Sequence, residues 1–174
     1  SHLFQPLENA IRIFIESITD VELTEESREI MELPCNMGGL GISNPVKQAD
    51  IEYNNSCTLT DNLKTAIVSR AEHANNDNSS ARASVRAALR EHTQGLRDDI
   101  YARADENNKR TLDILQDKGT STWLTTQPSE SHDFYLNAQE FRDALAIRYE
   151  WNIKDMAKQC ECGKPNNIDH ALSC

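Results

Sequence analysis

The fold of this chain depends on one stretch, Leu33-Pro34-Cys35-Asn36-Met37-Gly38-Gly39-Leu40-Gly41-Ile42-Ser43-Asn44-Pro45. Pro34 cannot continue a helix, whereas Asn44-Pro45 supplies an N-cap followed by a first-turn proline. Three glycines in four residues permit positive φ and close backbone approach. We expect a tight turn that lets Leu40 and Ile42 enter a core. A phosphate-binding loop is the alternative, but it needs a preceding strand and a Gly-Lys-Ser/Thr ending, which this stretch lacks.

Two helices are expected before this turn. Pro6 suits the first helical position, and apolar residues then recur at helical spacing. A second helix is expected from an N-cap at Thr24, with Glu25 and Glu26 in its first turn, to a stop at Pro34. The apolar side chains expected to face inward are Leu7, Ile11, Phe14, Ile15, Ile18, Ile30, Met31 and Leu33.

Three further helical segments are expected after the turn. One runs from Asn44-Pro45 to about Cys57, and its inward-facing residues are expected to be Val46, Ala49, Ile51 or Tyr53, and Cys57. Another is capped by Asp61 and carries Leu63, Ile67 and Val68. The polar stretch 74–80 then predicts a linker and a domain boundary. Residues 81–118 predict one long helix, whose apolar stripe is Val85, Leu89, His92, Leu96, Ile100, Ala104, Leu112 and Leu115.

The long helix also carries a ridge of arginines. Arg82, Arg86 and Arg90 lie at i, i+4 and i+8, with Arg97 further along the same segment. Such a ridge can follow a phosphate backbone, although the solvated side of a helix has the same appearance. We therefore list these four arginines as candidate nucleic-acid contacts.

The segment 119–174 holds most of the aromatic side chains. Gly119 ends the long helix, and Asn137 is expected to cap a helix that reaches about Tyr149. Five aromatic residues could form a small core next to the end of the chain, or they could stack on bases. They are Trp123, Phe134, Phe141, Tyr149 and Trp151.

Three of the five cysteines gather with a histidine in the last fifteen residues. Cys160, Cys162, His170 and Cys174 have the spacing C-x-C-x7-H-x3-C, and thiolate and imidazole are the ligands that zinc prefers. A turn at Cys162-Gly163-Lys164-Pro165 and one helical turn that places His170 and Cys174 on one face would close the site. The alternative is three unrelated cysteines near a frayed end.

Composition limits the possible functions. The chain has 174 residues, 38% hydrophobic and 6% aromatic, with six glycines and five prolines, which is typical of a helix-rich protein with little core material. Its formal net charge of −10 argues against a surface that binds nucleic acid everywhere. Residues 1–50 hold three Lys/Arg against nine Asp/Glu, whereas residues 81–118 hold eight against seven. Nucleic-acid contact is therefore expected in the middle and at the cysteine cluster. No run of apolar residues predicts a membrane span, the cysteine pattern favours a reducing compartment, and no catalytic set is indicated.

The order of several segments resembles the region after the polymerase core in non-LTR retrotransposon reverse transcriptases of the restriction-like-endonuclease type. The resemblance rests on Phe4-to-Ile11, on Leu33-Pro…Gly38-Gly-Leu-Gly-Ile-Ser-Asn-Pro45 and on the C-x-C-x7-H-x3-C spacing. Ser121-Thr-Trp-Leu-Thr and Glu140-to-Tyr149 lie between them in the same order. The polymerase Asp-Asp motif and an endonuclease carboxylate–lysine set are absent.

This resemblance implies a function and a set of partners. It implies a non-catalytic fragment of an RNA-directed DNA polymerase that helps to position template RNA or target DNA during target-primed reverse transcription. Cys160, Cys162, His170 and Cys174 would be zinc-knuckle ligands, and Lys164 in the knuckle joins the candidate nucleic-acid contacts. The parent protein would act in the nucleus after a cytoplasmic ribonucleoprotein stage, with no membrane and no small-molecule substrate for this fragment.

The expected fold is mainly α. It comprises a thumb-like helical bundle over 1–73, a polar linker over 74–80, a long charged helix over 81–118 and an aromatic helical segment with a zinc knuckle over 119–174. A second function remains open at this stage, a helical protein–protein interaction module in which the zinc is purely structural.

Overall fold

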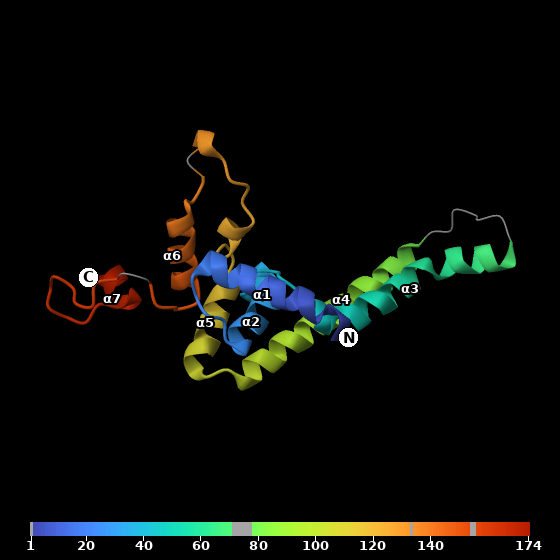
Figure 1. Cartoon of the computed structure of the whole chain (residues 1–174), viewed down its shortest axis with the longest axis horizontal. Coiled ribbons are helices and arrows are strands. Elements are labelled where there is room, and N and C mark those ends of the chain that lie inside the picture. Colours follow the sequence, from blue (N-terminus) through green and yellow to red (C-terminus); the bar gives the residue numbers. More distant parts are fainter. Residues whose placement is uncertain (1, 71–77, 133, 154–155) are drawn as a thin grey trace.

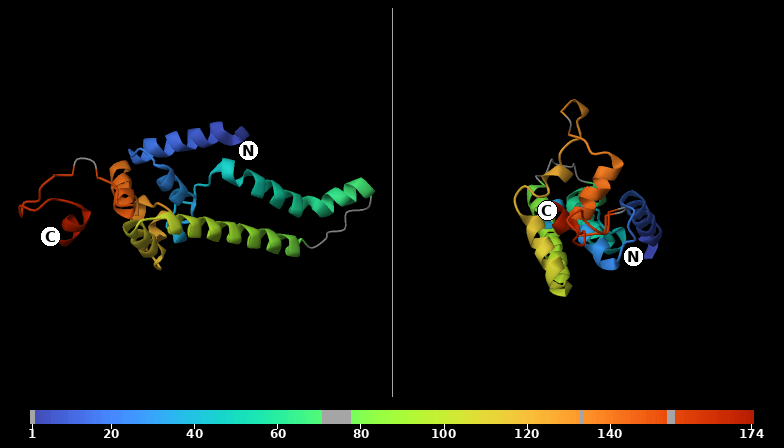
Figure 2. Two further views of the ribbon diagram at one scale, coloured as in Figure 1. Left: turned by 90° about the horizontal axis from the view of Figure 1, so that it is seen from below. Right: turned by 90° about the vertical axis from the view of Figure 1, so that its left-hand side faces the viewer.

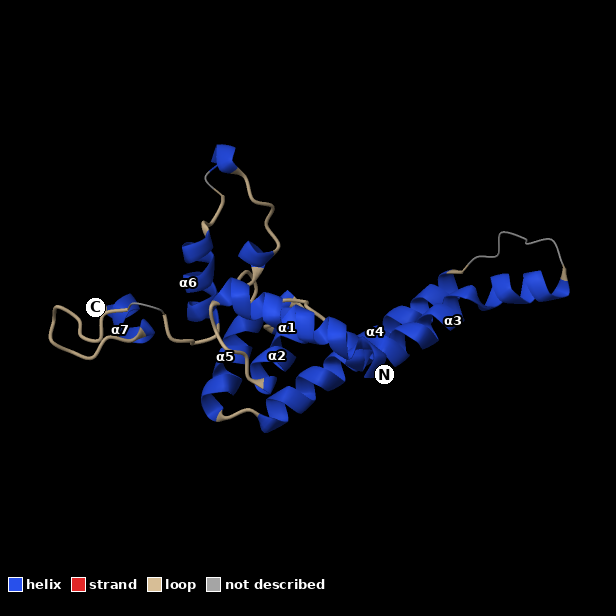
Figure 3. Ribbon diagram, in the orientation of Figure 1, coloured by secondary structure: helices blue, strands red, loops and turns tan. Residues whose placement is uncertain are grey.

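The computed structural model describes residues 2–70, 78–132, 134–153 and 156–174. Helices dominate the described part of the chain, which contains no strand, so the predicted mainly α class is confirmed (Figure 3). The α-helices are α1 (Gln5–Thr19), α2 (Glu25–Glu32), α3 (Pro45–Ser69), α4 (Ser79–Arg103), α5 (Glu106–Gln116), α6 (Ala138–Arg148) and α7 (Ile168–Ser173). Short 3-10 turns are η1 (His2–Phe4), η2 (Cys35–Met37), η3 (Thr122–Leu124) and η4 (Glu130–His132).

The molecule is elongated, with a central head between two extensions (Figures 1 and 2). Helices α1, α2, α5 and α6 form the head. Helices α3 and α4 lie side by side and form an arm that leaves the head on one side. The segment that contains α7 leaves it on the opposite side, and the loop between η3 and α6 projects separately.

Local side-chain chemistry starts several of the helices where the sequence predicts. The Thr24 hydroxyl accepts a hydrogen bond from the Ser27 N–H at the start of α2. The Asn44 side chain accepts from Val46 and Lys47 at the start of α3. Asn137 and Glu140 form a reciprocal capping box on α6. Each cap satisfies backbone donors that have no partner within the helix.

The stretch 33–42 forms the predicted tight turn and lies at the centre of the core. Leu33 is fully buried with Ile100 and Leu112, whereas Leu40 and Ile42 pack against a second cluster formed by Ile15, Leu23 and Met31. A Cβ on Gly39 would lie 1.9 Å from the Leu33 carbonyl oxygen, so only glycine permits this approach. The core therefore joins residues on both sides of the predicted boundary at 74–80, most of which lies outside the described residues.

A buried ion pair connects the first two helices to this turn. Arg28 on α2 donates to both carboxylate oxygens of Glu8 on α1 at 2.8 Å, and the side chains are 2% and 9% exposed. The same guanidinium donates to the carbonyls of Ile42 and Ser43. Arg28 thus neutralises the Glu8 carboxylate and also satisfies two backbone carbonyl acceptors.

The structure corrects the predicted helix boundaries on either side of the arm. Asp61 does not begin a new helix, because α3 continues from Pro45 to Ser69 without a glycine or proline to interrupt it. The helix predicted over 81–118 is two helices, since the chain bends at Ala104 and Asp105 caps α5 by accepting from the Asn108 N–H at 2.8 Å. This bend lets Ile100 and Leu112 contact the same buried Leu33.

Several apolar side chains expected to face inward are exposed. On α1, Ile15 is buried, but Leu7 is 51% exposed and Phe14 is 63% exposed. On α3, Tyr53 and Cys57 face solvent, as do Leu63, Ile67 and Val68 near the end of the arm. The described residues leave these positions on both helices exposed.

Candidate metal centre

A tight turn brings the first two cysteines of the cluster close together. The Cys160 N–H donates to the Lys164 carbonyl at 2.9 Å, and the Gly163 N–H donates back to the Cys160 carbonyl at 2.8 Å. Gly163 has φ of 83°, a conformation that favours glycine. The turn predicted after the first ligand pair is therefore present, and it directs the Cys160 and Cys162 side chains to one side.

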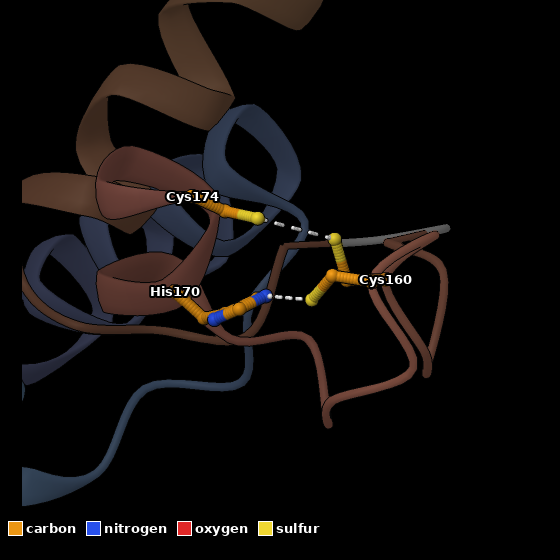
Figure 4. Close-up of side chains that lie close together, drawn as sticks. Cys160, His170 and Cys174 are labelled. Carbon is orange, nitrogen blue, oxygen red and sulfur yellow. Dashed lines mark hydrogen bonds between the residues drawn. The ribbon is translucent and has the colours of Figure 1, made fainter.

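Helix α7 supplies the other two side chains. The Asn167 side chain caps the helix by accepting from the His170 N–H at 2.7 Å. The Cys174 N–H then donates to the His170 carbonyl at 2.9 Å, so His170 and Cys174 are one helical turn apart. Their side chains project from the same face of α7 toward the cysteine turn (Figure 4).

The four donor atoms converge on one point. All of them lie within 4.8 Å of one another. The Cys160 and Cys174 sulfurs are 3.9 Å apart, and the Cys162 sulfur is 3.1 Å from His170 Nε2 (Figure 4). Tetrahedral zinc, with Zn–S bonds of ~2.3 Å, places two thiolates about 3.8 Å apart. The residues present therefore fit a metal ion bound by three cysteines and one histidine.

Hydrogen bonds within the cluster change the acidity of two thiols. The Cys162 backbone N–H, followed by His170, stabilises the Cys160 thiolate and lowers the pKa of Cys160 to about 6. Hydrogen bonds to the Cys162 and Cys160 sulfurs hold the proton on Cys174 and raise its pKa. Cys160 is thus ready to ligate a cation at neutral pH, whereas Cys174 must first lose its proton.

The predicted arginine ridge separates into two parts. Arg82, Arg86 and Arg90 are exposed along the first half of α4, and none of them has an ion-pair partner in the described part of the chain. Arg97 is different, because its side chain is 19% exposed and lies near Asp98 at 3.5 Å and Asp113 at 3.8 Å. Its guanidinium also lies 5.2 Å from the centre of the Tyr101 ring, so Arg97 is occupied within the head.

Lys164 is exposed in the turn that carries Cys162, beside the metal cluster. The arginines of α4 and the cluster are not brought together, since the arm and the α7 segment extend from opposite sides of the head (Figures 1 and 2). Contact with one nucleic acid at both places would require it to pass along the head.

Four of the five aromatic residues form two pairs in place of one small core. Trp123 and Phe141 meet edge to face with ring centres 6.1 Å apart, and Tyr149 and Trp151 are 4.9 Å apart. Trp151 packs on the cluster of Ile15, Leu23 and Met31, at the head and away from the cysteines. Phe134 is 65% exposed, so the predicted aromatic core next to the knuckle is wrong in this respect.

Sequence reasoning missed a hollow on the head between α2 and α5. Its volume is about 160 Å³, and its lining includes Ile30, Leu112, Tyr149 and Trp151. The polar lining residues, called the rim below, include Glu26 and Asn108. Residues from three distant segments form it, so no local pattern could have revealed it.

Among the described residues, no helix combines the length and the apolar character needed to cross a membrane. Comparison of the chain with protein-family models, curated proteins and solved structures finds no match. The chemistry of the site follows from its geometry alone. Cys160, Cys162, His170 and Cys174 form a cluster that could hold a metal ion.

Proposed function

We propose that this chain is a non-catalytic, zinc-stabilised segment of a retroelement reverse transcriptase that helps to position template RNA or target DNA. The observation that carries the proposal is the convergence of Cys160, Cys162, His170 and Cys174 within 4.8 Å, at the end of an ordered series of segments that resembles this family. Three thiolates and one imidazole favour zinc over harder cations, and four protein ligands are typical of a structural site.

The arginine ridge supplies a surface for the phosphate backbone in this proposal. Eight residues of α-helix separate Arg82 from Arg90, a rise of about 12 Å. Phosphates follow one another at ~3.4 Å along each strand of B-DNA, so three arginines can meet several of them. The net charge of −10 limits the affinity of the isolated chain, and the parent protein would supply further contacts.

Salt-dependent binding tests the nucleic-acid part of the proposal. We expect structured RNA and nicked duplex DNA to bind at low salt and to dissociate steeply as salt rises, as measured by fluorescence anisotropy at several salt concentrations. The double substitution Arg86→Glu with Arg90→Glu should weaken binding and reduce the salt slope by about two. Absence of binding even at low salt would contradict the proposal.

A matched control distinguishes a specific effect of the arginine ridge from a general effect of net charge. Arg110→Glu with Lys118→Glu makes the same change in charge at two exposed positions on or next to α5, away from the ridge. We expect this control to bind nucleic acid nearly as well as the unchanged chain. Equal losses of nucleic-acid affinity in both double variants would show that the arginine ridge makes no specific contact with nucleic acid.

Metal analysis tests the zinc part separately. We expect one zinc per chain in a reduced sample, and loss of that zinc in Cys162→Ser. Cys57→Ser is the control, because Cys57 is exposed on α3 and takes no part in the cluster. A folded, reduced chain without zinc would overturn the metal assignment.

A helical protein–protein interaction module with a structural zinc is the second candidate. Two observations favour it, the net charge of −10 and the exposed apolar side chains on α1 and its lead-in turn, among them Leu3 at 78% and Phe14 at 63%. A chain that retains zinc but does not bind nucleic acid even at low salt would favour this candidate.

A further inference from the structure

The hollow between α2 and α5 opens to solvent and has both apolar and polar lining residues. The apolar and aromatic lining residues, called the floor below, are Ile30 from α2, Leu112 and Leu115 from α5, and Tyr149 and Trp151 beyond α6. The volume of about 160 Å³ is far larger than a single water requires, and the hollow opens to solvent. An extended aliphatic chain can therefore lie on this floor.

The polar residues of the rim include one carboxylate. Glu26 is the one charged residue among the nine that line it, alongside Ser27, Asn108 and Thr111. Glu26 has no ion-pair partner within the described residues. Its neighbour Glu29 differs, because Lys47 and Arg103 both donate to it, at 2.8 and 2.7 Å.

Two cations of the chain lie near the hollow, Arg103 and Arg148. Arg103 lines a smaller adjoining hollow with Glu26; its guanidinium forms an ion pair with Glu29 at 2.7 Å, and Glu26 acts on it through the longer-range electrostatic field. Arg148 lies 5.5 Å from the centre of the Tyr149 ring and donates to the carbonyls of Cys35 and Gly39 and to the Ser121 hydroxyl. Arg148 is 6% exposed and belongs to the interior, where its Nε and Nη1 have no hydrogen-bond partner among the described residues.

We infer that this hollow binds an arginine or lysine side chain presented by a basic segment of a protein partner. The aliphatic stem would lie on Ile30, Leu112 and Leu115, and the cationic group would meet the Glu26 carboxylate and the amide of Asn108. The acidic surface supports this occupant over a nucleic acid, because residues 1–50 carry nine acidic against three basic side chains. The inference goes beyond the proposed nucleic-acid role and uses neither the arginine ridge nor the metal cluster.

The experiment follows the emission of Trp151 on the full chain. The chain has two tryptophans, so Trp123→Phe leaves Trp151 as the one reporter. The probe is a short glycine/serine peptide with two arginines, compared with the same peptide containing citrulline, which is neutral and of nearly the same shape. We expect a saturable change with the arginine peptide and none with the citrulline peptide.

Two variants and one control locate the binding. Glu26→Gln should weaken peptide binding roughly fivefold, and Asn108→Lys should weaken it at least as much by placing a cation on the rim. Glu22→Gln, an exposed acidic neighbour outside the hollow, should leave the affinity unchanged. Far-UV circular dichroism confirms that each variant is folded.

Several results would overturn the inference. They are the absence of a saturable change, equal binding of the citrulline peptide, and equal weakening by Glu26→Gln and Glu22→Gln. A saturable Trp151 response to structured RNA, with none to the arginine peptide, would assign the hollow to nucleic acid instead. A peptide response that persists after removal of zinc, and in the double variant of Arg86 and Arg90, would show that this site is independent of the proposed function.

Discussion

Gly39 shows how strictly one residue can be constrained by its neighbours. Its Cα faces the end of α2, where the Leu33 carbonyl oxygen and the Ile30 carbonyl oxygen would lie 1.9 and 2.6 Å from an added Cβ. These are backbone atoms, so they cannot move aside as a flexible side chain would. Gly95, in the interior of α4, has open space around the same position.

Substitution of these two glycines should have opposite effects. We expect Gly39→Ala to destabilise the chain by about 3 kcal/mol or more, because the turn must open and expose the core. Gly95→Ala should stabilise it by about 0.5–1 kcal/mol, since alanine reduces the backbone entropy lost in a helix. Urea denaturation followed by circular dichroism measures both, and equal effects would contradict this account of the turn.

The metal ligands also predict a dependence on pH. The pKa of Cys160 is lowered to about 6 and that of Cys174 is raised. Cys160 and Cys174 must both be deprotonated to bind a metal ion, so protons compete with the ion for their sulfur atoms. We expect zinc affinity to rise with pH above neutrality as Cys174 loses its proton, and to fall further below about pH 6 as Cys160 gains one.

Calorimetry can check this linkage directly. Titration of zinc at neutral pH in two buffers with different ionisation enthalpies should show that protons are released on binding. Cys174→Ser should release fewer protons as well as binding zinc more weakly. A heat of binding that does not depend on the buffer would contradict the assigned protonation of Cys174.

At the scale of elements, the Glu8–Arg28 pair decides how α1 sits on α2. The residues are 20 apart in the sequence, and four hydrogen bonds from one guanidinium join α1, α2 and the segment before α3. Much of the apolar surface of α1 remains exposed, although Ile15 is buried. Other polar contacts add to this pair, since Arg12 donates to Glu25 and to the Leu23 carbonyl and Arg142 donates to the Ile18 carbonyl. The orientation of α1 therefore depends largely on polar contacts.

Removal of one partner from this pair should be costly. We expect Arg28→Met to destabilise the chain by about 3–5 kcal/mol, because Glu8 is left buried without a partner. Lys109→Met, which breaks the surface pair with Glu106, should cost less than about 1 kcal/mol. The double variant Glu8→Leu with Arg28→Met should recover part of the loss, and a double-mutant cycle by chemical denaturation tests this coupling.

On the scale of the whole molecule, the metal cluster lies apart from the buried clusters. Both hydrophobic clusters are built from the head and the base of the arm, and neither includes a residue after Trp151. The C-terminal segment contributes one helix of six residues. The stability of the head should therefore depend little on the metal.

Removal of the metal is expected to unfold the knuckle alone. Treatment with a chelator should remove the helical signal of α7 and leave α1 to α6 folded, because their core contacts are unchanged. Far-UV circular dichroism should change slightly, and amide protection should be lost only after Trp151 in hydrogen exchange. Cooperative unfolding of the head on chelation would contradict this separation.

The sequence by itself determined the helical class, several helix starts and the cysteine and histidine set that could hold a metal ion. Thr24, Asn44 and Asn137 cap helices through hydrogen bonds that span two or three residues, and the cysteine turn and α7 are equally local. Such features depend on nearby residues, so a pattern in one short stretch is sufficient to predict them. The convergence of the four donor atoms confirms the predicted cluster, while the identity of its metal stays a prediction.

Only the tertiary structure decided which surfaces are buried and which charges are free. The bend at Ala104 brings Ile100 and Leu112 into contact with Leu33. Arg97 lies near Asp113, whereas Arg86 is exposed. The tertiary structure also formed the hollow beside Trp151 from three separate segments. Burial and ion pairing depend on residues far apart in the chain. Helical periodicity predicts which face of a helix is apolar, but it does not predict which other element packs on that face.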